Sequence, residues 1–508
     1  MIVGSLGMRA HATLDVGSRR ELFVDDYLIE RISGEAKLQI HHPVPREIVL
    51  THNAPWEGSG SGYHSVFKDG DLYRMYYKAW TVQLKDGKYT ETNPLYTCYA
   101  ESGDGVHWRK PELGIHDFKG SKANNIVMTT GKIGQVHVDA GHVAVFKDTN
   151  PAASPDARYK AIFRSNARWG KPEGIPKGLL PFKSGDGLHW LPMSDAPVIT
   201  DGAFDSQNLA FWDSERGVYR AYWRYFEEGT GIEPPGIRGV RTATSKDFVK
   251  WGNQEDLSYV DSPPEQLYTN QINAYYRAPQ ILIGFPARYV DRGWSDSMRA
   301  LPEPAHREAV DKEVRRYGTA ITEGLLMASR DGVRFKRWNE AFLRPGIERE
   351  GTWNYGQQFI AWHVVETKSA LKGAPNELSL YASESYCTPP SVSTDLRRYT
   401  LRLDGFVSVQ ASMKGGELLT KPLRFEGKRL VLNFSSSAAG DVRVELLDEK
   451  GSPIPGYSLE ECLPVFGDAI ERPVMWRRGS DLAHLAGKTL KIRFVLRDSD
   501  VYAFQFQP

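Results

Sequence analysis

The sequence predicts an all-β protein, a five-bladed β-propeller followed by a C-terminal antiparallel β-sandwich. The first observation is a recurring turn sequence: Ser-x-Asp, then Gly or Phe, a hydrophobic residue and a nearby Trp. It occurs four times between residues 101 and 338. The second is that each copy follows two runs of alternating aromatic and β-branched residues, a pattern typical of strands. The third is a change after residue 406, where short strand-like runs alternate with loops rich in Gly, Ser and Pro.

The composition excludes several classes of protein. A chain of 508 residues is long enough for two or three domains. The 64 Lys and Arg residues nearly balance the 63 Asp and Glu residues, so no net field favours nucleic acid or an acidic membrane as a partner. Cys98, Cys387 and Cys462 are odd in number and far apart, which excludes a disulfide framework and a paired metal motif.

The chain is expected to divide into three parts. Residues 1–19 contain a short apolar run without the basic start or apolar core of a secretion signal, so they are predicted to be a flexible leader. No window approaches the roughly 18 apolar residues of a membrane-spanning helix, and a cytoplasmic location is expected. The propeller is predicted over residues 20–406 and the sandwich over 407–508.

Four of the five predicted blades carry the turn sequence, and the fifth lacks both the turn and a fourth strand. The segment 20–30, RELFVDDYLIE, is predicted to supply that outer strand, because closing the ring removes a free sheet edge. Asp25 and Asp26 would then be structural. Only the charged insertion 295–318, predicted to lie at the surface, and residues 481–487 resemble helices.

The turn sequence is interpreted as structural. Because it follows the third strand of a blade, it shows which run of residues is the first strand and which is the second. Its Ser and Asp oxygens are suited to accept backbone N–H groups, Gly supplies positive φ, and Trp packs against the neighbouring blade. In an antiparallel blade the start of strand one and the end of strand two share a face. The loops leaving strand two are long, which favours this face as the functional one. They cover approximately residues 79–95, 165–177, 225–237, 289–321 and 385–396.

Charged residues end the second strand of every predicted blade. One interpretation is that each pairs with a neighbouring residue of opposite charge and ties two blades together. The other is that the cations line a funnel for an anionic or heavily hydroxylated ligand. In blade order these residues are Lys78, Arg164, Arg224, Arg288 and Glu384.

Carboxylates converge on the same face. Glu57, Asp139 and Asp205 lie at the starts of the first strands of blades one to three, and Glu350 lies just before the fifth. Glycoside hydrolysis requires one protonated and one ionised carboxyl group, so these four residues and Glu384 are the candidate catalytic residues. Asp205 stands out because DSQN places four polar side chains where an inner strand should become apolar.

Further polar and aromatic residues at these strand starts are predicted to bind sugar hydroxyls or stack on sugar faces. They are Gln207, Asn208, Tyr268, Asn270 and Tyr355. His64 and His142 occupy equivalent positions in blades one and two, and are assigned to the same ligand site. A divalent metal beside these histidines stays open as an alternative, but the tight spacing of metal ligands is absent and no cofactor is predicted.

The motifs ELFVDDYLIE, APWEG, YAESGDGVHWRKPELG, NNIV, RYKAIF, FDSQNLAFWD and LDGFVSV together resemble a bacterial family labelled glycoside hydrolase family 32-like. The resemblance covers nearly the whole chain. It implies the same two-part fold, related to the invertase/levanase and arabinanase/xylosidase propellers. The chain lacks the Trp-x-Asn-Asp-Pro, Arg-Asp-Pro and Glu-Cys signatures of the invertase type at the expected places, which argues against fructans as substrates.

The resemblance also implies three acids from different blades, acting as base or nucleophile, pKa-tuning residue and general acid. By blade position, Glu57 or Asp139 would be the base or the tuning residue. Asp205 would be the central acid, and Glu384 or Glu350 the general acid.

The predicted function is hydrolysis of an oligo- or polysaccharide in an axial pocket, by water attack between a base and an acid. The four cations favour an acidic or sulfated saccharide. Two alternatives stay open: a polysaccharide lyase assisted by a metal or His, and a carbohydrate-binding propeller without catalysis. A free carboxyl pair would favour hydrolysis, a metal held by His64 and His142 the lyase, and carboxylates all bound to Arg the binding protein. The oligomeric state stays open.

Overall fold

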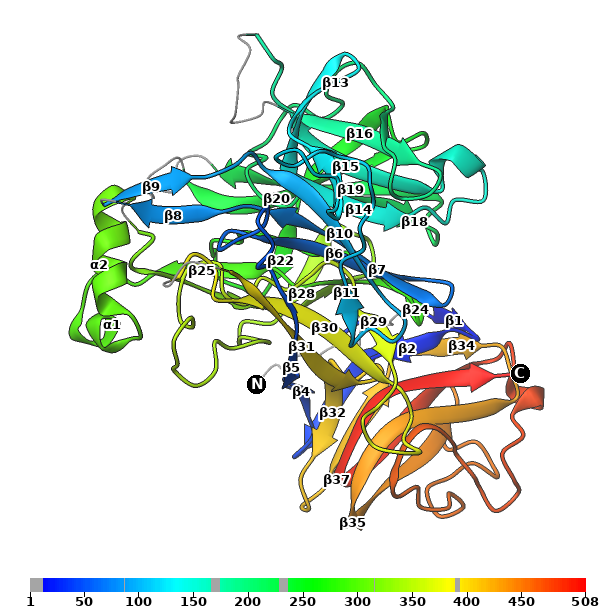
Figure 1. The fold of residues 1–508 in the computed structure, drawn as a ribbon. Helices are drawn as coiled ribbons and strands as arrows, with labels where there is room; N and C mark the ends of the chain where they lie inside the picture. The colour runs from blue at the N-terminus through cyan, green and yellow to red at the C-terminus, as the bar shows by residue number, and fades with distance from the viewer. Residues whose placement is uncertain (1–11, 86, 166–173, 228–235, 315, 389–392) are drawn as a thin grey trace, which may run out of the picture. The chain divides into compact units, whose positions relative to one another are not determined.

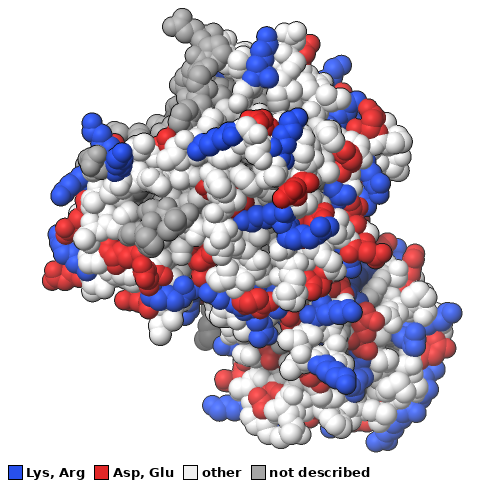
Figure 2. Space-filling view, in the orientation of Figure 1, with Lys and Arg blue, Asp and Glu red and all other residues white. Residues whose placement is uncertain are grey.

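The structure is a computed structural model that describes the chain except for residues 1–11, 86, 166–173, 228–235, 315 and 389–392 (Figure 1). The chain forms two compact units. One is His42–Leu401; the other joins the described residues up to His41 with Arg402–Pro508. On the face shown in Figure 2, basic and acidic side chains are interspersed, as the balanced composition predicts.

The unit His42–Leu401 is the predicted five-bladed β-propeller, with one sheet per blade, and all blade strands pair antiparallel except one in blade four. Blade one contains β6 (Gly62–Asp69), β7 (Leu72–Ala79), β10 (Tyr96–Ser102), β11 (Trp108–Arg109) and β12 (Ile126–Thr129). Blade two contains β13 (Gly131–Ile133), β14 (Val136–Lys147), β15 (Tyr159–Ser165), β16 (Leu179–Ser184) and β17 (Leu191–Pro192). Blade three contains β18 (Leu209–Asp213), β19 (Val218–Glu227), β20 (Ile237–Ser245) and β21 (Trp251–Asp256).

The last two blades complete the ring. Blade four contains β23 (Asn273–Tyr275), β24 (Ala278–Gly284), β27 (Met327–Ser329), β28 (Arg334–Arg337) and, parallel to β28, β22 (Ser258–Val260). Blade five contains β29 (Val365–Thr367), β30 (Glu377–Glu384), β31 (Asp395–Arg402) and β5 (Val44–Thr51). Elements outside the blade sheets are β8 (Val82–Lys85), β9 (Lys88–Glu91), β25 (Ala287–Asp291), β26 (Ala320–Gly324), α1 (Asp296–Ala300), α2 (Pro304–Glu313) and the 3-10 turn Pro155–Ala157.

The ring is closed by an N-terminal strand, but not by the predicted one. β5 pairs antiparallel with β31, with Thr51 opposite Asp395 and Leu50 opposite Leu396. The segment 20–30 instead contributes β2 (Arg20–Leu22) and the start of β3 (Ile29–Gly34) to the other unit, where Phe23 and Leu28 are fully buried. Both segments have a strand pattern, and that pattern does not say which sheet a strand joins.

The second unit is the β-sandwich; besides the predicted C-terminal part, which here begins at Arg402, it includes the described residues up to His41. Part of the predicted leader forms β1 (Leu14–Gly17), which pairs with β34 (Leu423–Phe425), so the prediction of flexibility is wrong there; residues 1–11 lie outside the described residues. The unit's ten strands surround one apolar core. The remaining elements are β4 (Lys37–Ile40), β32 (Val407–Ala411), β33 (Gly416–Thr420), β35 (Arg429–Leu447), β36 (Asp468–Pro473), β37 (Thr489–Gln507) and the 3-10 turn Ala483–Leu485.

The recurring sequence forms the predicted turn. In blade one, Ser102 Oγ accepts the N–H of Gly105 at 2.9 Å, and Asp104 Oδ1 accepts two further backbone N–H groups at 2.8 Å. The same bonds recur in the other three copies. The indole of Trp108 lies edge-on to Tyr381 of blade five, at a centroid distance of 5.8 Å. The turn therefore fixes the end of a blade and joins it to its neighbour, as predicted.

Two buried glutamines join the inner edges of all five blades. Gln207, before β18 of blade three, donates its amide to the carbonyls of Tyr63 in blade one at 2.9 Å and Val143 in blade two at 3.2 Å. Gln271, before β23 of blade four, donates to Gln207 Oε1 at 2.8 Å and to the carbonyl of Ile360, next to blade five, at 2.9 Å. Both side chains are almost fully buried, so these bonds satisfy polar groups that water does not reach.

Replacing Gln207 with Ala should destabilise the propeller by about 2–4 kcal/mol, because it removes the donor to two buried carbonyls and the acceptor of one of the two hydrogen bonds of the Gln271 amide. Urea unfolding followed by tryptophan fluorescence measures the change. Gln83→Ala, at an exposed position in β8, is the matched control and should change the free energy of unfolding by less than about 0.5 kcal/mol. Equal effects of the two substitutions would contradict an axial role for Gln207.

Candidate active site

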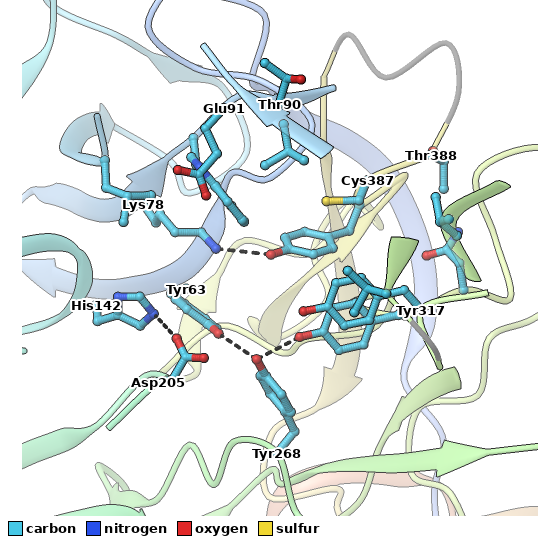
Figure 3. A pocket seen from close by; sticks show the side chains of 18 of the residues that line it. Tyr63, Lys78, Thr90, Glu91, His142, Asp205, Tyr268, Tyr317, Cys387 and Thr388 are labelled. Carbon is cyan, nitrogen blue, oxygen red and sulfur yellow. Dashed lines mark hydrogen bonds and ion pairs between the residues drawn. The ribbon is translucent and has the colours of Figure 1, made fainter. Parts of the chain in front are cut away.

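A cavity of about 460 Å³ lies among the starts of the first strands and the loops that leave the second strands. Blades one to three contribute Lys78, Asp139 and Asp205, among others. The loops contribute residues of the β8–β9 hairpin, of α2 and of the segment 386–388 (Figure 3). This placement supports the sequence-based choice of the face with the long loops.

At one side of the cavity His142 contacts Asp205 (Figure 3), and its other ring nitrogen contacts Asp139. His142 Nδ1 is 3.1 Å from Asp139 Oδ2, and His142 Nε2 is 3.1 Å from Asp205 Oδ1. Arg164 contacts both carboxylates, with Nε 3.3 Å from Asp139 and Nη1 donating to Asp205 at 2.8 Å. The structure thus brings together four residues that the sequence predicted from two different blades. We call them the Asp205 cluster.

The backbone of β14 explains how this cluster forms. Asp139 pairs in register with Arg164 of β15, and the register shifts between Asp139 and Val143, which marks a β-bulge. The bulge contains Gly141 and His142. A Cβ on Gly141 would lie 2.8 Å from Leu95, so a glycine is required for this close approach. The bulge directs His142 towards the cavity.

The two aspartates differ in their surroundings. Burial favours the neutral form of Asp139, but His142, Arg164 and the amide of Gly141 outweigh burial and lower the pKa of this carboxyl. The pKa of Asp205 is lowered well below its ordinary value, because His142, Arg164 and Arg224 outweigh its own desolvation. The Asp139 side chain is completely buried, whereas 72% of the Asp205 side chain is exposed in the cavity. Asp205 is therefore the ionised carboxylate that a ligand can reach.

Five tyrosines form much of the opposite wall. The hydroxyl of Tyr268 accepts hydrogen bonds from Tyr355 at 2.7 Å and Tyr63 at 3.4 Å, and Lys78 donates to Tyr386 at 3.2 Å (Figure 3). The fifth ring, of Tyr317, stacks on Tyr355 at 4.8 Å. Aromatic faces and phenolic hydroxyls together are suited to the apolar faces and hydroxyls of sugars.

Two of these wall residues are held under unfavourable conditions. Tyr63 has a φ of +54°, a left-handed conformation that is costly for an aromatic residue and typical of functional sites. Burial lowers the pKa of Lys78 to about 8, and its ammonium lies over the rings of Tyr63 and Trp80.

Besides Asp139, Asp205 and Glu91, the cavity is lined by the carboxyl group of Glu303, which precedes α2. Burial and the nearby negative charge of Glu350 raise the pKa of Glu303, although Arg307 and the backbone at Gly351 act in the opposite direction. Its Oε1 atom is buried and has no hydrogen-bond partner among the described residues. Sequence reasoning missed Glu303 because the charged insertion 295–318 was interpreted as surface.

Three of the predicted catalytic carboxylates are not among the described residues that line this cavity. Glu57 is buried and binds Lys110 at 2.5 Å and the hydroxyl of Tyr77 at 2.5 Å. Glu384 is buried beside Arg349 and Arg397, at 2.6 and 2.9 Å.

Glu350 is exposed and acts on the site through the charge it presents to Glu303. These surroundings argue against the catalytic roles predicted for Glu57, Glu384 and Glu350. The position of a carboxylate along a strand predicts the face on which it lies, but not whether a nearby Lys or Arg forms an ion pair with it.

Of the four predicted cations at the ends of the second strands, three line a cavity and one forms ion pairs within the protein. Lys78 and Arg164 line the main cavity, and Arg224 lines an adjoining one. Arg288 instead lies in β25, beyond the end of β24, and pairs with Glu323 and Glu265 at 2.5 and 2.9 Å. The structural interpretation therefore applies to Arg288, and its predicted role in substrate binding is wrong.

Of the remaining residues predicted to bind the ligand, three line the cavity and the others are buried in the protein. Tyr268, Tyr355 and His142 line the cavity. His64 lies in the equivalent bulge of β6, but its ring is buried against His52, with 3.0 Å between the Nε2 atoms. Gln207, Asn208 and Asn270 are buried and bond to the protein itself, so the prediction that they bind sugar is not supported.

Within the described ranges, no group of three or more His, Cys, Asp and Glu side chains is arranged to hold a metal ion. The same residues contain no helix that is long and apolar enough to cross a membrane.

Comparisons with known proteins give remote structural similarities. No family model matches the chain, and no curated protein sequence matches it. A family 43 arabinoxylan arabinofuranohydrolase from Bacillus subtilis, solved with cellotetraose, is 13% identical; the match covers 92% of this chain and 99% of that one, with a TM-score of 0.41. An N-acetylgalactosamine deacetylase from F. plautii is 13% identical over 72% of this chain and 94% of that one, with a TM-score of 0.43. A thermostable family 43 glycoside hydrolase is also 13% identical, over 71% and 96%, with a TM-score of 0.43.

Proposed function

We propose that the protein is a glycoside hydrolase whose catalytic carboxyl groups are Asp205 and Glu303. The observation that carries the proposal is that these two groups line one cavity and have pKa values shifted in opposite directions. An ionised and a protonated carboxyl group in one site are the pair that hydrolysis of a glycosidic bond requires.

In this mechanism Asp205 accepts a proton from water as the water oxygen bonds to the anomeric carbon. Glu303 gives its proton to the glycosidic oxygen as the bond to the anomeric carbon breaks. Asp139, His142 and Arg164 hold the Asp205 carboxylate in place and keep it ionised. They are positioning residues, because Asp205 is the member of the cluster most exposed to the cavity.

The wall of the cavity supports a saccharide as the substrate. Its tyrosine rings offer faces for stacking, and its hydroxyls and Lys78 offer hydrogen bonds. A volume of about 460 Å³ lies within the range of small-molecule sites, which suits a short segment of a saccharide chain.

Asp205→Asn should lower kcat/KM about 10²–10⁴-fold, because an amide does not accept the proton from water. A panel of neutral and anionic saccharides, followed by product release, identifies the substrate and measures the loss. The exposed Asp195→Asn is the matched control and should leave the rate unchanged. Stability should change little in D205N, since Arg164 keeps its contact with Asp139. Full activity of folded D205N would contradict the role of Asp205, and no product from any saccharide in the panel would contradict the proposed function.

The pH profile of kcat/KM tests the role of Glu303. A general acid works while protonated, so activity should fall as pH rises through the raised pKa of Glu303, above the ordinary 4.5. Glu303→Gln should remove this basic limb together with most of the rate. Glu350→Gln removes a neighbouring negative charge, so the limb should move to lower pH while the maximal rate persists. A basic limb that neither substitution moves would rule out Glu303 as the acid.

A polysaccharide lyase is the second candidate, and the arginines near Asp205 favour it, because a lyase neutralises the carboxylate of a uronate before it removes a proton. Its product carries a carbon–carbon double bond and takes no oxygen from water. Turnover in ¹⁸O-labelled water therefore separates the two reactions: hydrolysis places the label in the new reducing end, and elimination does not.

A further inference from the structure

A second cavity adjoins the first, and five cations are among the residues that line it. It also has a volume of about 460 Å³, and it shares Arg164, Asp205 and Tyr268 with the catalytic cavity. We call it the basic recess and define it by four further residues that line it: Lys177, Arg224, Arg238 and Arg316.

No carboxylate in the described part of the chain forms an ion pair with these four cations. The Nη1 of Arg238 donates to the amide oxygen of Gln266 at 2.8 Å, and the Nε of Arg224 donates to the carbonyl of Ala203 at 3.1 Å. Both partners are neutral. Arg238 is only 7% exposed and Arg224 only 6%, so water compensates little of their charge.

Two other buried arginines of the propeller differ. Arg288 pairs with two glutamates, and the fully buried Arg337 pairs with Glu265 at 2.9 Å. The buried Arg307 instead donates to backbone carbonyls, among them that of Trp353 at 2.7 Å. The basic recess has the carboxylate of Asp205 beside five cations, Arg164 and the four that define it, which is a costly arrangement unless an anion adds to it.

Aromatic rings hold the cations in position instead. The guanidinium of Arg238 lies 4.7 Å from the ring centre of Tyr289, and that of Arg224 lies 5.2 Å from the ring centre of Tyr268. Burial and the positive charges of Arg224 and Arg316 lower the pKa of Arg238, which shows that like charges face one another here. Ring contacts leave the edges of a guanidinium available to donate hydrogen bonds.

Two buried donors of the recess also lack a partner among the described residues. They are the Nε of Arg238 and the hydroxyl of Tyr289. Buried donors are nearly always bonded in folded proteins, so an acceptor is missing at this point. The acceptor that fits a group of guanidinium, ammonium and hydroxyl donors is an oxyanion.

We propose that the basic recess binds an oxyanion beside the catalytic carboxylate Asp205. Its source is either a carboxylate or sulfate group carried by the saccharide or a free inorganic phosphate. If the saccharide carries the oxyanion, the inference rests on the proposed function. The substrate of the catalytic cavity is then an acidic or sulfated saccharide. The shared lining places the anion next to the sugar whose bond is cleaved.

Binding of small anions by the whole protein tests the site without any need for turnover. Isothermal titration calorimetry at low ionic strength is carried out with inorganic phosphate, sulfate, glucuronate and, as the neutral control, glucose. We expect saturable binding of at least one anion, and affinity at least tenfold higher than for glucose. Absence of saturable binding for all three anions would overturn the proposal.

Arg238→Gln removes the central cation and should weaken anion binding about tenfold or more. Arg316→Gln, at the less buried cation, gives a second variant should R238Q fail to fold, and it should weaken binding in the same sense. Arg334→Gln changes the net charge equally at an exposed position of β28 and should bind as the native protein does. Equal weakening by R334Q, or none by R238Q and R316Q, would contradict the site.

The source of the oxyanion follows from two further measurements. If the saccharide carries it, glucuronate or a sulfated monosaccharide should compete with phosphate, and cleavage of acidic saccharides should fall in R238Q more than cleavage of neutral ones. If free phosphate is the ligand, added phosphate should change the rate of the native protein but not of R238Q. Anion binding that R238Q abolishes, without cleavage of any saccharide, would refute the hydrolase and leave the anion site standing.

Discussion

The hydrogen bonds between Gln207, Gln271 and the inner edges of the blades are the interaction on which the rest of the propeller depends. Five sheets meet at one axis, where their backbone groups are buried and cannot be satisfied by a neighbouring strand of the same sheet. Two long amide side chains bridge these gaps and reach all five blades. Because the inner edges are fixed, the loops that leave the second strands surround the same axis, and the catalytic cavity and the basic recess adjoin one another there.

The same short segment builds the axis and the site. Asp205 lies two residues before Gln207, so the residue that joins the blades also fixes the carboxylate that faces the cavity. Arg164 and His142, from the neighbouring blade, hold that carboxylate ionised. In the proposed function, the reactive group thus lies in the segment just before β18, whereas its partner Glu303 comes from the insertion that contains α2.

The sequence predicted the blades correctly, because their turn sequence repeats. It did not predict the roles of individual strands and carboxylates, because these depend on the partners that the fold brings beside them. The Ser-x-Asp turn revealed the blades and their phase, and the phase brought Asp139, Arg164 and Asp205 to one place. The alternation of residues 20–30 predicted a strand but not its sheet, because β-strands of equal pattern pair with any edge that their side chains fit. Glu57 and Glu384 occupy the predicted positions, yet Lys110, Arg349 and Arg397 bind them. Glu303 could not be predicted from the sequence, because the burial and the neighbouring charges that raise its pKa come from residues that only the folded chain brings together.

The central claim is that Asp205 and Glu303 line one cavity and have pKa values shifted in opposite directions. Carboxyl ¹³C NMR of the protein labelled at Asp and Glu side chains, with D205N and E303Q used to assign the two signals, measures both titrations directly. The structure predicts that Asp205 stays ionised well below pH 3.8 and that Glu303 titrates above 4.5. Titration of both groups near those ordinary values, or in the reverse order, would contradict it.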